Sequence, residues 1–591
     1  MCELHIMENK KNIKELGERR NYAEIVEQLK SYFPSPISNP INDGYLIQTI
    51  SHFLDHLDHL KCVAPVLGKG LEQCEVCTLH KVNDEKIPML SRFEPESPGD
   101  NKQNFPQELS SVEEITELLA DYCHGMTIWS HPNAQVNVIP PPTISSIVAF
   151  IAAAIYNPNI IWDEYSVNFA QAEIQSIAML SDLLGYDPAN SGGIFTFGGT
   201  GTILYGCKLG VEKTLAGRGM FDGIREDIKI VASESSHYSR LNVASWLGIG
   251  TRNLVTIPST TENELSLTDF EKYLRKAFES REKVGAIIAT MGTTDAFGID
   301  DLAAIVNIRD NLVDEYDLEY SPHIHADAVI GWAWAVFKDY DFKDNPLGFH
   351  SRTLRSLNDS LMRISSLHMA DSIGIDFHKT GYAPYISSAF LVKNRQDLTL
   401  LSRAPDQMPY LYQFGHYHPG IYTLECSRPG TGALAALANI RLLGKQGYRV
   451  MIGHVVEMAE MLRERLERYP FIKVLNDYNY GPVTLFRVYP DGEDAKKIFH
   501  KETTSIDYEL KLKEHNAFNL RIFNQIHEKA MRGEGVLLSW TDAYRHANYP
   551  DGPPIAAIKS FIMSPWTDLD AVDTVIRQIL EARVHTPSLV I

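Results

Sequence analysis

The sequence is poor in cysteine and in basic residues. Its 591 residues include 7 cysteines, too few for a disulfide framework, and this usage predicts a reducing, cytoplasmic location. Lys and Arg number 55 against 75 Asp and Glu, so the net charge is −20. Because an acidic chain repels the phosphates of nucleic acids and anionic lipids, we expect no nucleic-acid partner.

Long apolar runs are also missing. The longest covers residues 144–156 and is ended by Asn157 and Pro158, whereas a membrane helix needs about 20 apolar residues. The first 20 residues are charged and polar, unlike a secretory signal. We therefore expect no membrane association, and we expect residues 144–156 to form a buried helix.

The composition is otherwise that of a folded chain, with 44% hydrophobic and 22% charged residues. At roughly 150 residues per domain, the length suggests about four units. The sequence pattern changes at three places. It predicts a helical N-terminal extension with a Pro-rich linker at residues 1–110 and a second helical segment at residues 111–185. An α/β region is expected at residues 186–445 and a smaller α+β region at residues 446–591.

Short apolar strands alternate with amphipathic helices after about residue 190. This alternation predicts a mainly parallel sheet with helices on both faces. We expect one helix to begin near Thr268, because Thr268 and Glu271 have the spacing of a capping box. The expected strands are residues 228–233, 253–258, 284–292, 323–329, 371–378 and 387–393.

Two predicted strands end in ionisable side chains. His378 and Lys379 follow an apolar strand, and ligands of open α/β sheets bind outside the carboxyl ends of strands. Desolvation there would lower the pKa of Lys379 and make it a nucleophile toward a carbonyl; a solvated lysine is the alternative. Asp327 ends another strand, where it could pair with the protonated ring nitrogen of a pyridine cofactor or cap a turn.

Three loops add polar groups. The glycine–threonine run 198–202 matches neither a Walker A loop nor GxGxxG, and it is either a phosphate cradle at a helix N-terminus or a plain turn. His237 stands at the start of a helix, in a structural or a catalytic role. Thr293 and Thr294 follow a strand, where they could contact a ligand carboxylate or cap the turn. In this order, the segments supply the parts needed to hold pyridoxal phosphate.

With these motifs the chain resembles the group II pyridoxal-phosphate-dependent amino-acid decarboxylases, which include glutamate, aromatic amino-acid and tyrosine decarboxylases. GIFTFGG resembles the glutamate-decarboxylase phosphate loop, and DFHKTGYAPY resembles the tyrosine-decarboxylase lysine motif. The resemblance covers residues 129–566. It implies a fold-type I transferase-like α/β fold, an N-terminal dimerisation segment, a large cofactor domain, a small C-terminal domain and an obligate homodimer with shared active sites.

The resemblance also assigns roles to the motif residues. Lys379 would form the Schiff base with pyridoxal 5′-phosphate, and Asp327 would pair with the pyridinium nitrogen. His237 would stack on the ring and help to orient the substrate. Gly199 and Thr200 would bind the phosphate.

Further roles rest on the same resemblance. His378 would lie close to the phosphate, and Thr293 would lie near the substrate carboxylate. Tyr410, in a mobile loop, would donate the proton that replaces the lost carboxylate. Ser427 and Gly430 would reach the phosphate of the partner subunit across the interface.

The substrate is less closely defined by the resemblance. Trp332 and Trp334 are bulkier than the usual family residues, and they could narrow the pocket or pack in the core. Lys559 stands where relatives carry an arginine that meets a substrate carboxylate, and lysine lacks the bidentate fork. Further candidate substrate contacts are His131, Gln135 and Asn137. The motifs favour an aromatic amino acid, with an acidic amino acid as the alternative.

Two other interpretations stay open. Another pyridoxal-phosphate enzyme, such as a sphingosine-phosphate-lyase-like carbon–carbon lyase, has a similar lysine segment. A non-catalytic scaffold is the third possibility, and the intact set of Lys379, Asp327, His237 and Tyr410 argues against it. Separately, a structural zinc site or reduced buried cysteines could account for the spacing of Cys62, Cys74, Cys77 and His80.

Overall fold

The structure is a computed structural model, and it divides into two compact units. The first unit is Met1–Ile128 with Glu528–Gly535, and the second is Trp129–His527 with Val536–Ile591. The residues that the structure describes are 29–30, 32–33, 44–61, 105–123, 126–408, 414–478, 481–532 and 534–587. Tyr410 and the four candidate zinc ligands lie outside these ranges.

Within its described residues, the smaller unit contains the helices α3 (Gly44–Lys61) and α5 (Val112–Asp121). A capping box between Ser111 and Glu114 starts α5. The Tyr45 hydroxyl donates to Glu113 Oε1 at 3.1 Å and links the two helices. The helices predicted in this part of the chain are therefore present where the structure describes it.

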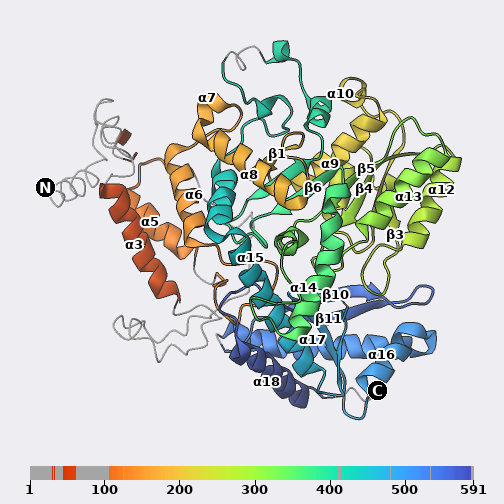
Figure 1. The fold of residues 1–591 in the computed structure, drawn as a ribbon. Helices are drawn as coiled ribbons and strands as arrows, with labels where there is room; N and C mark the ends of the chain where they lie inside the picture. Colours follow the sequence, from red (N-terminus) through yellow and green to blue (C-terminus); the bar gives the residue numbers. More distant parts are fainter. Residues whose placement is uncertain are drawn as a thin grey trace. The chain divides into compact units, whose positions relative to one another are not determined.

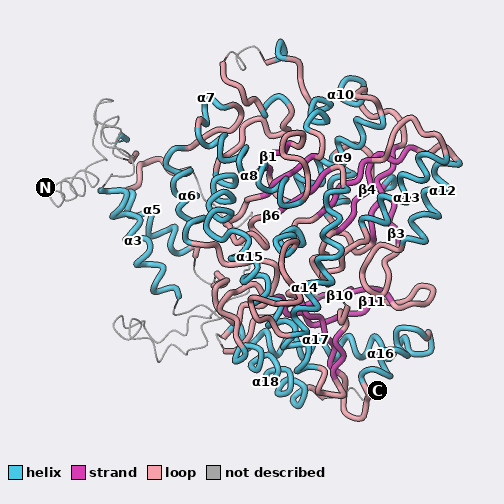
Figure 2. Tube along the Cα trace, viewed as in Figure 1, coloured by secondary structure: helices cyan, strands magenta, loops and turns pink. Residues whose placement is uncertain are grey.

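The larger unit is built around a seven-stranded sheet, shown in Figures 1 and 2. Strands β3, β2, β4, β5 and β6 are parallel, and β7 pairs antiparallel with both β6 and the edge strand β1. The order is β1-β7-β6-β5-β4-β2-β3. The strands are β1 (Gly192–Thr196), β2 (Ile228–Ser233), β3 (Leu254–Ile257), β4 (Lys283–Thr290), β5 (His323–Asp327), β6 (Ser372–Asp376) and β7 (Ser388–Val392).

The predicted mainly parallel sheet is confirmed, with one exception. Strand β7 runs antiparallel to β6, because the short stretch 377–387 joins them without the helical crossover that a parallel pair needs. Each of the other predicted strands overlaps an observed one.

Helices cover both faces of this sheet. Along β4, Ala286 and Ile288 pack against α9 and α11, whereas Ile287 and Ala289 face a core that includes residues of α12 and α13. The helices of this region are α6 (Ile144–Tyr156), α7 (Asp163–Ser166), α8 (Asn168–Leu184), α9 (Gly199–Thr214), α10 (Gly219–Asp222), α11 (Ser239–Trp246), α12 (Leu267–Glu279), α13 (Leu302–Glu315), α14 (Ser351–Ile364) and α15 (Thr431–Leu466).

Helix α9 lies unusually close to β5. A Cβ atom at Gly206 would stand 2.5 Å from His325 Nδ1, so only glycine permits this approach. Beneath the helix, Ser372 Oγ bridges His323 Nε2 at 2.8 Å and His325 Nδ1 at 2.9 Å. This packing brings the N-terminus of α9 to the carboxyl ends of β5 and β6.

Two sequence expectations about helices need correction. Helix α12 begins at Leu267, near Thr268 as expected, but its cap is not the pair of Thr268 and Glu271: the Ser266 side chain accepts from the Asp269 amide and caps the helix. The helix predicted at residues 144–156 is present, but only Ser146, Ala149 and Ala153 are buried. A helix formed by an apolar stretch of sequence can thus expose one of its faces at the surface of the chain.

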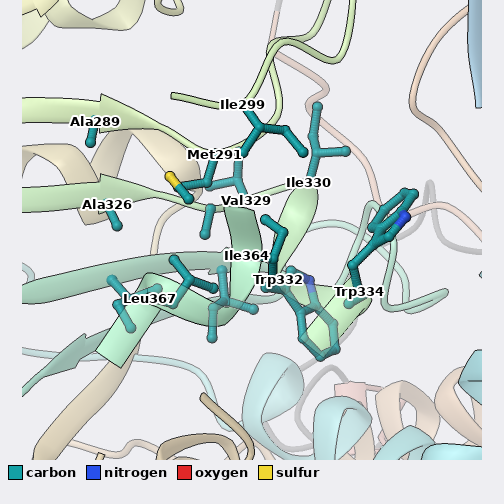
Figure 3. Close-up of a cluster of buried hydrophobic side chains, with 14 of the residues drawn as sticks. Ala289, Met291, Ile299, Ala326, Val329, Ile330, Trp332, Trp334, Ile364 and Leu367 are labelled. Atoms are coloured by element: carbon teal, nitrogen blue, oxygen red, sulfur yellow. The ribbon is translucent and has the colours of Figure 1, made fainter. Parts of the chain in front are cut away.

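The two bulky tryptophans lie in the core. Trp332 and Trp334 are fully buried in the short helix Gly331–Phe337. Trp334 stacks 4.5 Å from Phe297, and Trp332 lies 4.9 Å from Phe377. Figure 3 shows both indoles with aliphatic side chains of the same core cluster, among them Ile330 and Ile364. Of the two sequence alternatives, core packing is the one observed.

The C-terminal part of the larger unit has its own antiparallel sheet, in the order β10-β11-β9-β8. Helix α15 leads into it and departs from helical geometry at Gly444, whose φ is 54°. Residues 486–527 and 536–550 contribute to this α+β region, whereas residues 528–535, which include the end of α17, belong to the smaller unit. Its elements are β8 (Ile472–Val474), β9 (Val483–Val488), α16 (Ala495–Thr504), α17 (Glu509–Met531), β10 (Ser539–His546), β11 (Pro554–Phe561) and α18 (Leu569–His585).

Within the ranges described above, no helix combines the length and the apolarity needed to cross a membrane.

The buried ion pair between Arg463 and Glu460 allows the packing of this region to be tested. Arg463 is fully buried and donates to Glu460 Oε1 at 2.6 Å and to the Val483 carbonyl at 2.6 Å. Glu460→Gln should lower the free energy of unfolding by about 3–5 kcal/mol, because it leaves a buried cation without its counter-charge. Urea denaturation of the full chain measures this change.

Glu464→Gln is the matched control on the same helix. Glu464 pairs with Arg468 at the surface, and we expect a loss of about 0–1 kcal/mol. Equal losses in the two variants would contradict the role given to the buried pair.

Candidate active site

The candidate site lies at the carboxyl ends of β5 and β6, next to the N-terminus of α9. Asp327 is the last residue of β5 and is paired in register with Gly374 of β6. Lys379 follows three residues after β6 ends at Asp376. Two strand ends that are distant in sequence therefore bring an amine and two carboxylates together.

Lys379 is held by a carboxylate that the sequence reasoning missed. Its Nζ lies 3.0 Å from Asp376 Oδ2, and its side chain is mostly buried. Burial alone would lower the pKa of this amine, but Asp376 and Asp327 outweigh it and raise the pKa above its ordinary value. The expected lowering of the Lys379 pKa is therefore wrong. Only the position of Asp376 at the end of the same strand could have signalled its role.

Asp376 joins several parts of the site. Ser388 Oγ donates to its Oδ1 at 2.6 Å, and His378 Nε2 lies 3.4 Å from its Oδ2. His378 Nδ1 also accepts from the Ser387 amide at 3.2 Å. A Cβ atom at Gly199 would stand 3.0 Å from Asp376 Oδ2. The carboxylate thus reaches the first residue of α9.

Asp327 carries a buried oxygen that nothing in the described residues satisfies. The residue is 3% exposed, and its Oδ1 has no hydrogen-bond partner in that part of the chain. Burial raises the pKa of this carboxyl to about 6. A buried acceptor of this kind fits the protonated ring nitrogen of pyridoxal phosphate, which would supply the missing donor.

The N-terminus of α9 fits the phosphate of the same cofactor. The helix begins at Gly199, after Gly198 with a φ of 108°. Its first backbone amides and the positive end of its dipole favour an anion there. Thr202 Oγ1 donates back to the Gly199 carbonyl at 2.8 Å and secures the first turn. Thr200 lies in this turn, as the sequence predicted.

His237 is a neutral ring beside this group. Burial lowers its pKa to about 4, with a further contribution from Lys379. Its Nδ1 accepts from the Ser239 amide at 3.2 Å and contacts Ser239 Oγ at 2.9 Å. The ring centroid lies 4.1 Å from that of Tyr238. An oriented, uncharged imidazole suits contact with an aromatic ring.

A cavity of about 360 Å³ opens beside His237. Two tyrosine rings, Tyr238 and Tyr544, contribute to its wall. The charged wall residues are Glu234, Asp295 and Arg545. The lining is completed by Ser235, Ser236, Asn263, Thr293, Thr294, Ala296, Ala543 and His546. His237 lines this cavity, and the charges of both Lys379 and Asp295 act on its pKa.

Two predicted substrate residues are engaged by protein groups. Thr293 Oγ1 accepts from the amides of Ala296 at 3.3 Å and Gly298 at 2.9 Å, so it caps the turn. Lys559 Nζ lies 2.9 Å from Asp295 Oδ1. Thr541 Oγ1 donates to the other oxygen of Asp295 at 3.2 Å.

Three other candidates are not among the residues that line the cavity. His131 Nδ1 accepts from the Asn133 amide at 3.1 Å, and burial lowers its pKa to about 4. Asn137 Oδ1 accepts from the Val138 amide at 2.8 Å. Gln135 is fully buried and accepts from Ser560 Oγ at 2.7 Å. All three side chains hydrogen-bond to other groups of the protein.

The segment of Ser427 and Gly430 is anchored within its own chain. Ser427 Oγ accepts from Asn159 Nδ2 at 3.0 Å, and Gly430 precedes α15. Between them, buried Arg428 forms a bidentate ion pair with Glu173, at 2.6 and 2.9 Å. This pair, which sequence reasoning also missed, positions the segment against α8.

The surroundings of His237 predict the pH at which its imidazole ring becomes protonated. Since burial and Lys379 both disfavour the imidazolium, His237 should titrate at about pH 4 and stay neutral at physiological pH. NMR of labelled histidines, assigned with His237→Gln, measures the midpoint. A midpoint at the ordinary 6.5 would contradict this environment.

Comparison with known proteins agrees with this site. The family described as the pyridoxal-dependent decarboxylase conserved domain matches residues 98–488. An L-2,4-diaminobutyrate decarboxylase of Acinetobacter baumannii is 25% identical over 379 residues, which are 61% of this chain and 68% of the relative. An L-tyrosine decarboxylase of Enterococcus faecium is 27% identical over 262 residues, 41% of each chain.

A solved structure shares the fold. The glutamate decarboxylase domain of a Vibrio parahaemolyticus protein, named as a diaminobutyrate–pyruvate transaminase and L-2,4-diaminobutyrate decarboxylase, aligns with a TM-score of 0.66. It is 18% identical and covers 95% of this chain and 99% of its own. Because the family match alone spans well over half of the sequence, the chain belongs to the pyridoxal-dependent decarboxylase family and is a pyridoxal-phosphate-dependent carboxy-lyase.

Proposed function

We propose that this chain decarboxylates an L-amino acid with an uncharged, aromatic side chain to the corresponding amine and carbon dioxide. The observation that carries the choice of substrate is the balance of charge around the cavity beside His237. Glu234 and Asp295 contribute two negative charges. Arg545 and Lys559, the partner of Asp295, contribute two positive charges.

A balanced wall favours a neutral side chain, because a charged one would be desolvated without a free counter-charge. Lys559 is occupied by Asp295, which argues against an acidic substrate that needs the lysine for a second carboxylate. The rings of Tyr238 and Tyr544 line the same cavity and offer aromatic contacts.

The residues of the site would divide the work as follows. Asp327 would hold a proton at the pyridine nitrogen, the α9 amides at Gly199 and Thr200 would bind the phosphate, and Lys379 would supply the amine. When bound, the cofactor supplies an electron sink for the carbanion left by carbon dioxide. His237 would hold one ring face and exclude water from it.

A second candidate substrate is an amino acid with a cationic side chain. Asp295 is 45% exposed in its side chain, and Glu234 lines the same cavity, so either carboxylate could meet an ammonium group. The Acinetobacter relative is named for such a substrate. A carbon–carbon lyase of the sphingosine-phosphate type remains a third candidate on the lysine segment alone.

The assembly that we propose is a homodimer. Ile144, Ile147, Val148 and Ile151 follow one another at helical spacing on α6 and are all exposed. A continuous apolar stripe of this kind marks an interaction surface. We also propose a cytoplasmic location, which the free thiols of Cys123, Cys207 and Cys426 support.

Asp295 offers a test of the substrate. The wild-type chain, loaded with pyridoxal phosphate, should release carbon dioxide fastest from tyrosine or another aromatic amino acid. Asp295→Asn frees Lys559, so it should raise kcat/KM for glutamate or aspartate relative to tyrosine by about tenfold, or ~1.4 kcal/mol.

Asp542→Asn is the control, since Asp542 is exposed on the same strand as Thr541 and does not line the cavity. A wild-type preference for 2,4-diaminobutyrate would support the second candidate. Release of an aldehyde from a phosphorylated amino alcohol, without carbon dioxide, would support the third.

Substitution of Tyr410 tests whether its hydroxyl donates the proton that replaces the lost carboxylate. Tyr410→Phe should reduce amine formation by about 10²–10⁴-fold, the usual contribution of a positioned acid, while the visible absorbance of the bound cofactor stays. Tyr412→Phe, two residues along the same loop, is the matched control. Equal amine yields from wild type and Tyr410→Phe would exclude Tyr410 as the donor.

A further inference from the structure

The site contains one carboxylate more than the cofactor chemistry needs. Asp327 suffices for the ring nitrogen, and yet Asp376 stands in the same group. Asp376 lies close to Gly199, since a Cβ atom built on Gly199 would stand 3.0 Å from its Oδ2. Gly199 is the first residue of α9, and we expect this end of the helix to bind a phosphate. A carboxylate beside a phosphate site opposes the binding of the phosphate unless a cation compensates for it.

Lys379 is that cation. Its Nζ lies 3.0 Å from Asp376 Oδ2, and Ser388 Oγ fixes the other carboxylate oxygen at 2.6 Å. Since Ser388 lies directly across from Asp376 in the β6–β7 pairing, the carboxylate is held by the sheet. The position offered to the lysine amine is therefore built into the fold.

We propose that Asp376 is a positioning residue that docks the ammonium form of Lys379 whenever the lysine is not covalently bound, and that accepts its proton when the bond to the cofactor forms. This inference rests on the proposed use of Lys379 as the cofactor-binding amine.

The step balances as follows. The Lys379 ammonium gives one proton to the Asp376 carboxylate and becomes a neutral amine. The neutral amine could then form the carbon–nitrogen bond to an aldehyde, whose oxygen would leave as water with the two hydrogens of the amine. In the reverse direction, the released amine takes up a proton and returns to Asp376. Docked in this way, the freed lysine is kept from attacking the cofactor again.

Other titratable groups face the same pair. Asp327 on β5 also raises the pKa of Lys379, whereas burial lowers it. Tyr385, in the stretch before β7, adds a smaller effect. The pKa values of His378 and His237 are both lowered by burial, so these rings are neutral near pH 7. Asp376, which forms the ion pair, is therefore the main control on the charge of Lys379.

The test uses the full chain after removal of its cofactor. Pyridoxal phosphate is added at a series of pH values, and the rate at which the visible band of the bound cofactor appears is recorded. Asp376→Asn keeps the size of the side chain but loses its charge. We expect its pH midpoint to fall below that of the wild type by roughly 1–3 pH units, the usual effect of one close opposite charge.

Asp339→Asn is the matched control. Asp339 is an exposed carboxylate that pairs with Lys445 at 3.1 Å and with Arg449, outside the site, and its loss should leave the midpoint in place. A merely structural role for Asp376 would reduce the rate at every pH alike. A midpoint that does not move, or that rises, in Asp376→Asn would overturn the proposal.

A second measurement needs no variant and no cofactor. Acylation of lysines in the wild-type chain is followed by peptide mass spectrometry across pH, with the exposed Lys497 as an internal reference. We expect the acylation of Lys379 to begin at higher pH than that of Lys497, and onset at the same or lower pH would overturn the proposal. Because this readout is independent of cofactor and substrate, failure of the proposed function would be seen separately, as no band or no carbon dioxide.

Discussion

The ion pair between Lys379 and Asp376 is the interaction on which the account of the site depends. It exists because β6 ends at Asp376 and the chain turns there, so that Lys379, three residues later, lies beside the carboxylate. The parallel pairing of β5 with β6 adds Asp327 to the site, and α9 approaches from one side. The same arrangement buries Asp327 with one oxygen unsatisfied by the described residues. A pyridine nitrogen, an aldehyde and a phosphate thus each have a matching protein group.

Electrostatic balance extends from this pair to the substrate cavity. Around Lys379, two carboxylates face one ammonium, and the neighbouring histidines are neutral. Around the cavity, Asp295 is paired with Lys559, which leaves little net charge to attract a charged side chain. In the proposed function, substrate choice therefore depends on how the charges around the cavity pair with one another.

Much of the fold and part of the site could be predicted from the sequence. Apolar strand patterns are local, so β2, β4, β5 and β6 were predicted, as was the α/β class. Lys379, Asp327 and Gly199 follow strands or open a helix, and such positions converge in an open sheet. Glu173 and Arg428 were missed because the two partners are distant in sequence. Asp376 was missed although Lys379 is only three residues away, because no local pattern identifies an ion pair in a turn after a strand.

The expectation about the pKa of Lys379 was wrong because it left out the neighbouring carboxylates. Burial alone predicted a lowered pKa for Lys379, and the nearby carboxylates reverse that direction.

The roles given to the residues of the site depend on Lys379 being the amine that binds the cofactor. Borohydride reduction of the chain loaded with pyridoxal phosphate, followed by peptide mass spectrometry, tests it most directly. The account predicts one cofactor adduct per chain, on Lys379; an adduct on another lysine, with Lys379 unmodified, would contradict it.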